Sequence, residues 1–273
     1  MTSATDPGAG RDGEEAGAVD DMTPVPGGEY TRRRYRHGMT RAVDSGSRAA
    51  HEPRRRDGLS WLLLDWLDGE PLAGRALLDV GTGTGRLALA LAPRARRVVG
   101  IDTDAGRLVE ARRAARRLGI GNVVFVVADA ERADYRTLAV PDVVVAHLCF
   151  SDAIVARAAA ALPSGGLLAF AAFGPDQWRE TGRASRFAYA PERARQLLDT
   201  AGFRVERLAV EEEVRRFESA EEAQAATAGL RSRWEPDGRW AGWKRFLEAG
   251  SLTLTQSRVV RLARRERGRE PGA

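Results

Sequence analysis

The clearest candidate for a ligand-binding loop lies between two apolar segments. Residues 77–80 are apolar apart from Asp79, and residues 86–92 are mostly leucine and alanine. The glycines between these segments occupy alternate positions: Gly81, Gly83 and Gly85. This pattern predicts a buried strand, a tight turn that approaches a ligand closely, and a helix whose first N–H groups face an anionic or polar group. Dinucleotide-binding folds use the same geometry.

The spacing of these glycines nevertheless differs from the dinucleotide fingerprint. In the pattern G-x-G-x-x-G a glycine would stand where this chain has Arg86, and the third glycine comes one residue early. The acid two residues before Gly81 is also foreign to the nicotinamide pattern. The loop therefore favours another ligand.

Acidic residues end two further predicted strands. Residues 97–101 are followed by Asp102, which comes about twenty residues after the glycines. At this offset a carboxylate can accept hydrogen bonds from both hydroxyls of a ribose. Residues 122–128 form a third apolar run, which is followed by Asp129.

Later segments continue the alternation of strands and helices. The β-branched run at 141–147 suits a parallel strand that is buried on both faces. A fifth strand opens within 163–170, after Pro163-Ser164-Gly165-Gly166, and period-two alternation predicts a sixth at 203–210. The remaining predicted elements are helices at 59–67 and 191–201, and a last strand at 251–260.

Taken in order, these motifs resemble those of class I S-adenosylmethionine (SAM) methyltransferases. The glycine loop with its preceding acid resembles motif I of that family, and the proline–glycine–glycine step is also similar. The resemblance implies an α/β, Rossmann-like class I methyltransferase fold. Its sheet would be seven-stranded and mostly parallel, with helices on both faces and an antiparallel last strand. It also implies SAM as the cofactor.

The resemblance places the parts of SAM on particular residues. The methionyl part is expected at Asp79, Gly81, Thr82, Gly83 and Gly85. The ribose is expected at Asp102 with Thr103, and the adenine at Asp129 and Ala130. Each acid has an alternative role as a helix N-cap.

His147 ends the fourth predicted strand, where the transferred methyl group is expected. Its pKa lies near working pH, so it is a candidate base for a hydroxyl or amine; the alternative is a hydrogen-bonded wall of the SAM pocket. Cys149 lacks the preceding proline of C5-pyrimidine methyltransferases, which favours a small apolar filler. The three histidines show no metal-ligand spacing with this cysteine, so no metal is expected.

Composition predicts the domain organisation. Residues 1–29 contain few large apolar side chains, which predicts a disordered tail. We expect a helical cap at 30–73 and the methyltransferase domain at 74–263, with a helical insertion near 217–249. The last segment, 264–273, is expected to fray.

Charge and cysteine content constrain the partners. Lysine and arginine number 43 against 38 acids, for a net charge of +5. Most arginines stand among acids on predicted helix faces, which favours solvated faces over a polyanion site. A single cysteine, no secretory signal and no apolar run of membrane-spanning length favour a cytoplasmic protein without a membrane segment. The oligomeric state is not predicted.

The methyl acceptor is the least constrained feature. An acceptor pocket and simple packing are both open for the later aromatic residues: Trp178, Tyr189, Trp234, Trp240 and Trp243. Residues 173–180 and 217–222 are similar to segments of the carboxyl methyltransferase that acts on malonyl-acyl-carrier protein, while the SAM motifs are as similar to quinone C-methyltransferases.

We therefore predict a SAM-dependent methyltransferase that acts on a small molecule, mainly by in-line positioning. One alternative is a macromolecular acceptor, either RNA or an acyl-carrier protein. In that case the arginines between residues 32 and 56 would dock phosphates. The other alternative is a non-catalytic SAM-binding module.

Overall fold

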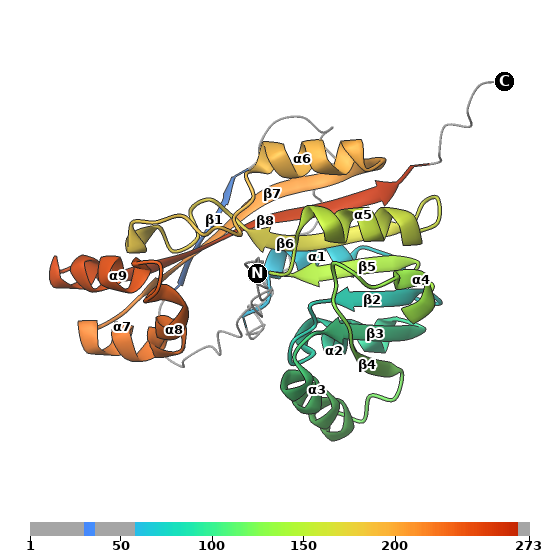
Figure 1. Cartoon of the computed structure of the whole chain (residues 1–273), viewed down its shortest axis with the longest axis horizontal. Helices are drawn as coiled ribbons and strands as arrows, with labels where there is room; N and C mark the ends of the chain where they lie inside the picture. Colours follow the sequence, from blue (N-terminus) through green and yellow to red (C-terminus); the bar gives the residue numbers. More distant parts are fainter. Residues whose placement is uncertain (1–29, 36–57, 267–273) are drawn as a thin grey trace, which may run out of the picture.

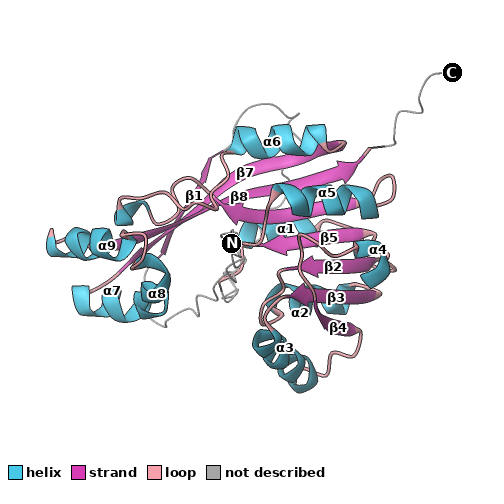
Figure 2. Cartoon of the chain, in the orientation of Figure 1, coloured by secondary structure: helices cyan, strands magenta, loops and turns pink. Residues whose placement is uncertain are grey.

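A single mixed β-sheet organises the molecule. The computed structural model describes residues 30–35 and 58–266. Within these residues the strand order is β1-β7-β8-β6-β5-β2-β3-β4. The strands are β1 (Tyr30–Tyr35), β2 (Ala76–Val80), β3 (Arg97–Asp102), β4 (Val123–Val127), β5 (Val143–His147), β6 (Leu167–Phe173), β7 (Phe203–Arg216) and β8 (Thr253–Arg265). Figure 2 shows them as one continuous layer with helices on both sides.

The strand directions confirm the predicted fold class. Strands β6, β5, β2, β3 and β4 are parallel to one another. The last strand, β8, runs antiparallel between β6 and β7. The seven expected strands are therefore present, and β1 is an additional one that pairs antiparallel with β7.

Two apolar layers cover the parallel strands because alternate side chains face opposite sides of the sheet. On one face Val143 and Val145 pack in a cluster with residues of α1 (Trp61–Asp68), α2 (Arg86–Leu91) and α3 (Ala105–Arg117). On the other face Val144 and Ala146 pack with α4 (Tyr135–Leu138), α5 (Asp152–Ala161) and α6 (Pro191–Thr200). The sheet is thus buried on both faces, as its unbroken apolar runs require.

A third layer stands at one end of the molecule, beside the ends of β7 and β8 (Figure 1). It contains α7 (Ala220–Thr227), α8 (Arg231–Trp234) and α9 (Arg239–Glu248), with short 3-10 turns at Arg179–Thr181 and Ala228–Leu230; another such turn, Ala92–Arg94, follows α2. Its core is aromatic: the Trp234 ring centroid lies 5.1 Å from that of Trp178 and 6.4 Å from that of Trp243. The Trp243 Nε1–H donates to Thr227 Oγ1 over 3.0 Å, which satisfies a fully buried polar group.

Two predicted boundaries are wrong. The helical cap expected at 30–73 does not begin with a helix, because residues 30–35 are a strand whose Tyr30 lies opposite Arg215 of β7. The tail expected to fray from residue 264 begins in a strand instead, because β8 continues to Arg265. Arg264 is held there by Glu70 and Glu206. Residues 1–29, 36–57 and 267–273 lie outside the described residues.

Candidate active site

The glycine loop connects β2 to α2 by left-handed backbone that favours glycine. Gly81, Gly83 and Gly85 have φ of +65°, +54° and +83°. A Cβ on Gly81 would overlap Cys149, and a Cβ on Gly85 would lie 2.8 Å from Phe125 Cζ. The loop therefore needs glycine for two reasons, its φ values and its close packing against neighbouring side chains.

Asp79 stabilises this loop from beneath. Its carboxylate is 1% exposed, and Oδ2 accepts hydrogen bonds from Thr82 Oγ1 at 2.6 Å and from the Ala88 N–H at 3.1 Å. Burial, together with a smaller contribution from the charge of Asp102, raises the pKa of Asp79 to about 7 in spite of these two hydrogen bonds. Asp79 is therefore an internal brace between the loop and the first turn of α2.

Asp102, at the end of β3, also binds backbone of the loop. Its Oδ2 accepts from the Gly83 N–H at 2.8 Å, and its Oδ1 accepts from the Asp104 N–H at 2.9 Å. A carboxylate offers about four lone-pair positions, so about two remain for a ligand. Asp129 is similarly placed beyond β4, where its Oδ1 accepts from the Glu131 N–H at 2.8 Å.

A cavity of about 150 Å³ lies at the carboxyl ends of β2, β3, β4 and β5, and we call it the glycine-loop cavity. It is lined by Gly81, Asp102, Thr103, Ala128, Asp129, Ala130, Glu131, Leu148, Cys149, Phe150, Ser151, Ile154, Ala172, Phe173 and Phe187. In parallel α/β sheets this edge is where ligands bind. The wall combines the carboxylates of Asp102, Asp129 and Glu131 with aromatic and aliphatic side chains.

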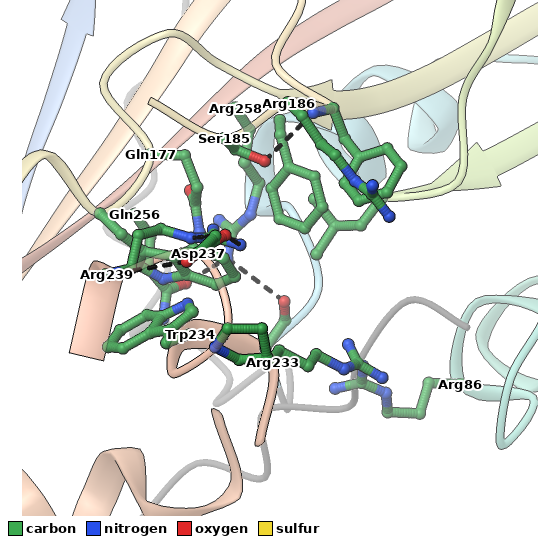
Figure 3. Close-up of a pocket in the computed structure, with 16 residues that line it drawn as sticks. Arg86, Gln177, Ser185, Arg186, Arg233, Trp234, Asp237, Arg239, Gln256 and Arg258 are labelled. Carbon is green, nitrogen blue, oxygen red and sulfur yellow. Dashed lines mark hydrogen bonds and ion pairs between the residues drawn. The ribbon is translucent and has the colours of Figure 1, made fainter. Parts of the chain in front are cut away.

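A second cavity of about 370 Å³ lies between the sheet and the third layer, and we call it the arginine-rich cavity. It is lined by Gly58, Arg86, Leu148, Phe173, Gln177, Trp178, Ser185, Arg186, Phe187, Arg233, Trp234, Pro236, Asp237, Arg239, Gln256 and Arg258. Figure 3 shows that these side chains come from distant parts of the chain, with Arg186 on the opposite side from Arg239. Its size is that of a pocket for a small organic molecule.

The two cavities share part of their wall. Leu148, Phe173 and Phe187 line both. Leu148 has a φ of +60°, an unfavourable value for a residue with a branched side chain, and its N–H donates to Ala171 O at 2.7 Å. Trp178, which lines the arginine-rich cavity, has a φ of +57°. Strained backbone of this kind costs of order 1–3 kcal/mol and clusters at functional sites.

His147 is held by the N-terminus of α1. Its Nε2 accepts a hydrogen bond from the Ser60 N–H at 3.0 Å, so a neutral ring carries its proton on Nδ1. Burial, followed by the charges of Arg258 and Arg86, holds the pKa of His147 well below its usual value. Its side chain lines neither of the two cavities.

A buried ionic network links this histidine to the arginine-rich cavity. Ser60 Oγ and the Leu62 N–H donate to Glu211 Oε2 at 2.8 and 2.9 Å. Glu211 also pairs with Arg258, whose Nη1 lies 3.3 Å from Glu213 Oε2. Burial opposes the charge on Arg258, but the two carboxylates outweigh it and raise its pKa. The network thus joins α1, β7 and β8 behind the cavity wall.

Comparison with known families finds a match for the part of the chain that contains the glycine loop. Residues 77–166 match the family model described as "Methyltransferase domain". These residues contain the glycine loop, Asp102 and Asp129. This part of the chain is therefore similar to the methyltransferase domain of that family.

The chain also has relatives in sequence. Ribosomal protein L11 methyltransferase of Pseudomonas paraeruginosa is 36% identical over 129 residues, which are 45% of this chain and 42% of that protein. The chain spans less than half the length of the curated relatives it matches.

Two solved structures share the fold. A putative methyltransferase from Bacillus halodurans has a TM-score of 0.56 at 21% identity, covering 75% of this chain and 99% of its own. A protein named as the [4+2]-cyclase SpnF has a TM-score of 0.54 at 23% identity, covering 76% of this chain and 80% of its own. These likenesses concern the fold alone.

The structure brings together half of the ten predicted cofactor residues in the wall of the glycine-loop cavity. These five are Gly81, Asp102, Thr103, Asp129 and Ala130. Asp79, Thr82, Gly83 and Gly85 shape the loop beside the cavity without lining it. The remaining residue, His147, lies behind the wall, and its assignment as cofactor contact and base stays a prediction.

The sequence did not indicate most of the arginine-rich cavity. Of the five aromatic residues for which a pocket and simple packing were both open, Trp178 and Trp234 line this cavity. The other three pack in apolar clusters and do not line it: Tyr189, Trp240 and Trp243. Arg186 and Phe187, which are neighbours in a loop, and the distant Gln256 belong to no sequence motif, so they carry no local signal.

Two further properties concern the described residues only. None of their helices has the length and apolar character needed to cross a bilayer. Within the same part of the chain no group of three or more histidine, cysteine, aspartate or glutamate residues is placed to hold a metal ion.

Proposed function

We propose that this chain is an enzyme that transfers a methyl group from SAM to a small-molecule acceptor. The observation that carries the proposal is the wall shared by the two cavities, at Leu148, Phe173 and Phe187. A methyl donor in the glycine-loop cavity and an acceptor in the arginine-rich cavity would meet at this wall. Meeting in the correct orientation is most of what such a reaction requires.

The glycine-loop cavity fits the chemical groups of SAM. Asp102 has lone pairs left for two ribose hydroxyls, and Asp129 is an acceptor for an exocyclic amine. Phe150 and Ile154 supply apolar surface for a purine ring. The overlap that a Cβ on Gly81 would make with Cys149 shows how closely the backbone borders this cavity.

When bound, SAM would supply an electrophilic methyl group, whose carbon accepts the acceptor's lone pair as its bond to sulfur breaks in line. The chain's own residues orient the two partners and exclude water. Phe173 and Trp178 are largely buried aromatic walls on the acceptor side. Because the sulfonium is already activated, a general base is needed only for an acceptor that must lose a proton as it is methylated.

Two observations support a small acceptor over a macromolecule. The arginine-rich cavity is a concave space of about 370 Å³ bounded by the third layer, which suits a molecule that enters it. The relatives named for ribosomal protein L11 match less than half of this chain and less than half of their own length. That match therefore supports the methyl donor and gives weak support for a protein acceptor.

The direct test is transfer of radiolabelled methyl from SAM into an extract of the source organism. We expect label in the low-mass fraction that resists nuclease and protease. Label in RNA or in protein would overturn the small-molecule acceptor, and the labelled species would identify the true one.

The cofactor site is tested by calorimetric binding of SAM to Asp102→Ala. Loss of charge-assisted hydrogen bonds to two hydroxyls should weaken binding roughly 100-fold. Asp199→Asn, on the exposed face of α6, is the matched control and should bind as the wild type does. Unchanged affinity in Asp102→Ala would remove Asp102 from the cofactor site.

A further inference from the structure

The polar groups of the arginine-rich cavity are unbalanced in charge. Its wall carries five arginines and a single aspartate. Two of these arginines have partners that offset their charge: Arg239 Nη2 lies 2.7 Å from Asp237 Oδ2, and Arg258 pairs with Glu211 and Glu213 behind the wall. Arg86 and Arg233 also have interaction partners, so the excess positive charge of this wall rests on Arg186.

Arg186 is the clearest case of an uncompensated cation. It forms no ion pair with the side chains of residues 58–266, and its guanidinium lies over the Phe187 ring at 4.7 Å from the centroid. Phe187 is 46% exposed and belongs to the wall shared with the glycine-loop cavity. An exposed cation thus stands next to the place where donor and acceptor would meet.

The neutral polar groups of the same wall are also chiefly donors. Gln177 is 3% exposed, and its Oε1 accepts from the Ser257 N–H at 2.7 Å, which leaves its amide N–H groups for a ligand. A guanidinium has five N–H donors and no acceptor. A ligand rich in acceptor atoms would match such a wall better than one rich in donors.

The rest of the wall is aromatic. Phe173 and Trp178 pack with ring centroids 5.5 Å apart, and Trp178 continues to Trp234. Indole and phenyl faces bind flat apolar groups and exclude water, which strengthens a nearby ionic contact. A single uncompensated cation beside neutral donors matches one negative charge rather than the two of a phosphate monoester.

We propose that the arginine-rich cavity binds a small organic carboxylate with a flat apolar body, and that Arg186 confers the preference for the anion. The inference rests on the proposed function, because it names the chemical class of that reaction's acceptor. Arg186 acts here as a specificity-determining residue: guanidinium and carboxylate form paired, directional hydrogen bonds.

The experiment compares two probes of the same shape, 2-naphthoate and its neutral analogue 2-naphthamide. Binding to the full chain is measured by calorimetry and by quenching of tryptophan fluorescence. We expect the acid to bind at least tenfold more tightly than the amide. In Arg186→Gln the advantage of the acid should fall below threefold, while amide binding is unchanged.

The matched control is Arg195→Gln, which removes another exposed arginine, on α6 and outside both cavities. It should keep the full preference for the acid. Equal affinity for the two probes, no binding of the acid at millimolar concentration, or a preference that survives in Arg186→Gln would each overturn the proposal.

Calorimetry with S-adenosylhomocysteine on the same samples separates the two proposals. Binding of S-adenosylhomocysteine without a preference for 2-naphthoate over 2-naphthamide would refute only the carboxylate inference. A chain that prefers the acid without binding S-adenosylhomocysteine refutes the proposed methyl transfer and leaves the anion site standing.

Discussion

The two cavities are built in opposite ways. The glycine-loop cavity takes its polar groups from the ends of consecutive strands, and its carboxylates bind backbone N–H groups only two to nineteen residues away. The arginine-rich cavity takes its groups from segments far apart in the sequence, and Gln177 binds backbone eighty residues away. One site is local in the sequence, and the other exists only after the sheet is complete.

The charge of the two cavities differs as much as their origin. Carboxylates dominate the polar wall of the first, and guanidinium groups dominate that of the second. This difference suits a cationic sulfonium on one side and an anionic acceptor on the other. Four variants, in order of expected effect, test how far the glycine-loop cavity depends on contacts local in the sequence and the arginine-rich cavity on contacts between distant segments.

Gly81→Ala tests the close packing of the glycine loop and should have the largest effect. The new Cβ combines a left-handed φ with an overlap against Cys149, so we expect a loss of about 4 kcal/mol in the free energy of unfolding and loss of SAM binding. Gly119→Ala is the control, because its φ of +67° is the same but nothing lies within 4 Å. Denaturant unfolding measures both. Equal losses would mean that close packing against Cys149 is unimportant.

Glu211→Gln tests the buried ionic network behind the arginine-rich cavity. It leaves Arg258, which is 2% exposed, with a single weaker counter-ion, and we expect a loss of about 3 kcal/mol in the free energy of unfolding. Breaking the exposed pair of Asp199 and Arg195 with Asp199→Asn should cost less than about 0.5 kcal/mol. A loss in Glu211→Gln no greater than in this control would show that the network is not needed.

Asp79→Asn tests how the free energy of unfolding depends on pH through the carboxyl beneath the glycine loop. The pKa of Asp79 is about 7 in the folded chain and 3.8 in the unfolded one, so the folded state binds the proton more tightly. Stability therefore falls as pH rises from about 4 and levels off above about 7. Between about pH 5.5 and pH 8 the wild type should lose about 2 kcal/mol that Asp79→Asn retains. Thermal unfolding across this range measures the difference; parallel curves would contradict it.

His147→Gln should have the smallest effect. A general base contributes about 10²–10⁴-fold to a rate, whereas a residue that only accepts the Ser60 N–H should cost less than tenfold. We expect the smaller value, with no change in the pH profile between about pH 6 and 8. A loss of a hundredfold or more, with a titration that disappears in the variant, would restore the predicted catalytic role.

The sequence predicted the local half well because its signals are short-range. The glycines, Asp102 and Asp129 stand at strand ends, and strand ends are marked by the change from apolar to polar residues. The fold class followed from the same alternation. His147 was placed correctly at the end of β5, but its partner Ser60 is 87 residues away and no pattern connects the two.

The sequence predicted the arginine-rich cavity and the strands beside it poorly, because charged residues interrupt the apolar patterns that mark strands and helices. The sixth strand was expected to end at residue 210, where acids begin, yet β7 continues to Arg216. It does so because Glu211 and Arg215 are buried with partners on other elements, Arg258 and Glu222. A buried ion pair appears in sequence as two ordinary surface charges. The same reason applies to Arg239 and Arg258 of the cavity wall, which pair with Asp237 and with Glu211.

Cys149 gives the molecule a built-in reporter. It is the chain's only cysteine, it lines the glycine-loop cavity, and burial raises its pKa to about 12. Alkylation at neutral pH should therefore be slow, confined to one position, and slower still whenever the cavity is filled. The mass of a single adduct, followed over time, then measures cavity occupancy in unlabelled protein, even in a crude mixture.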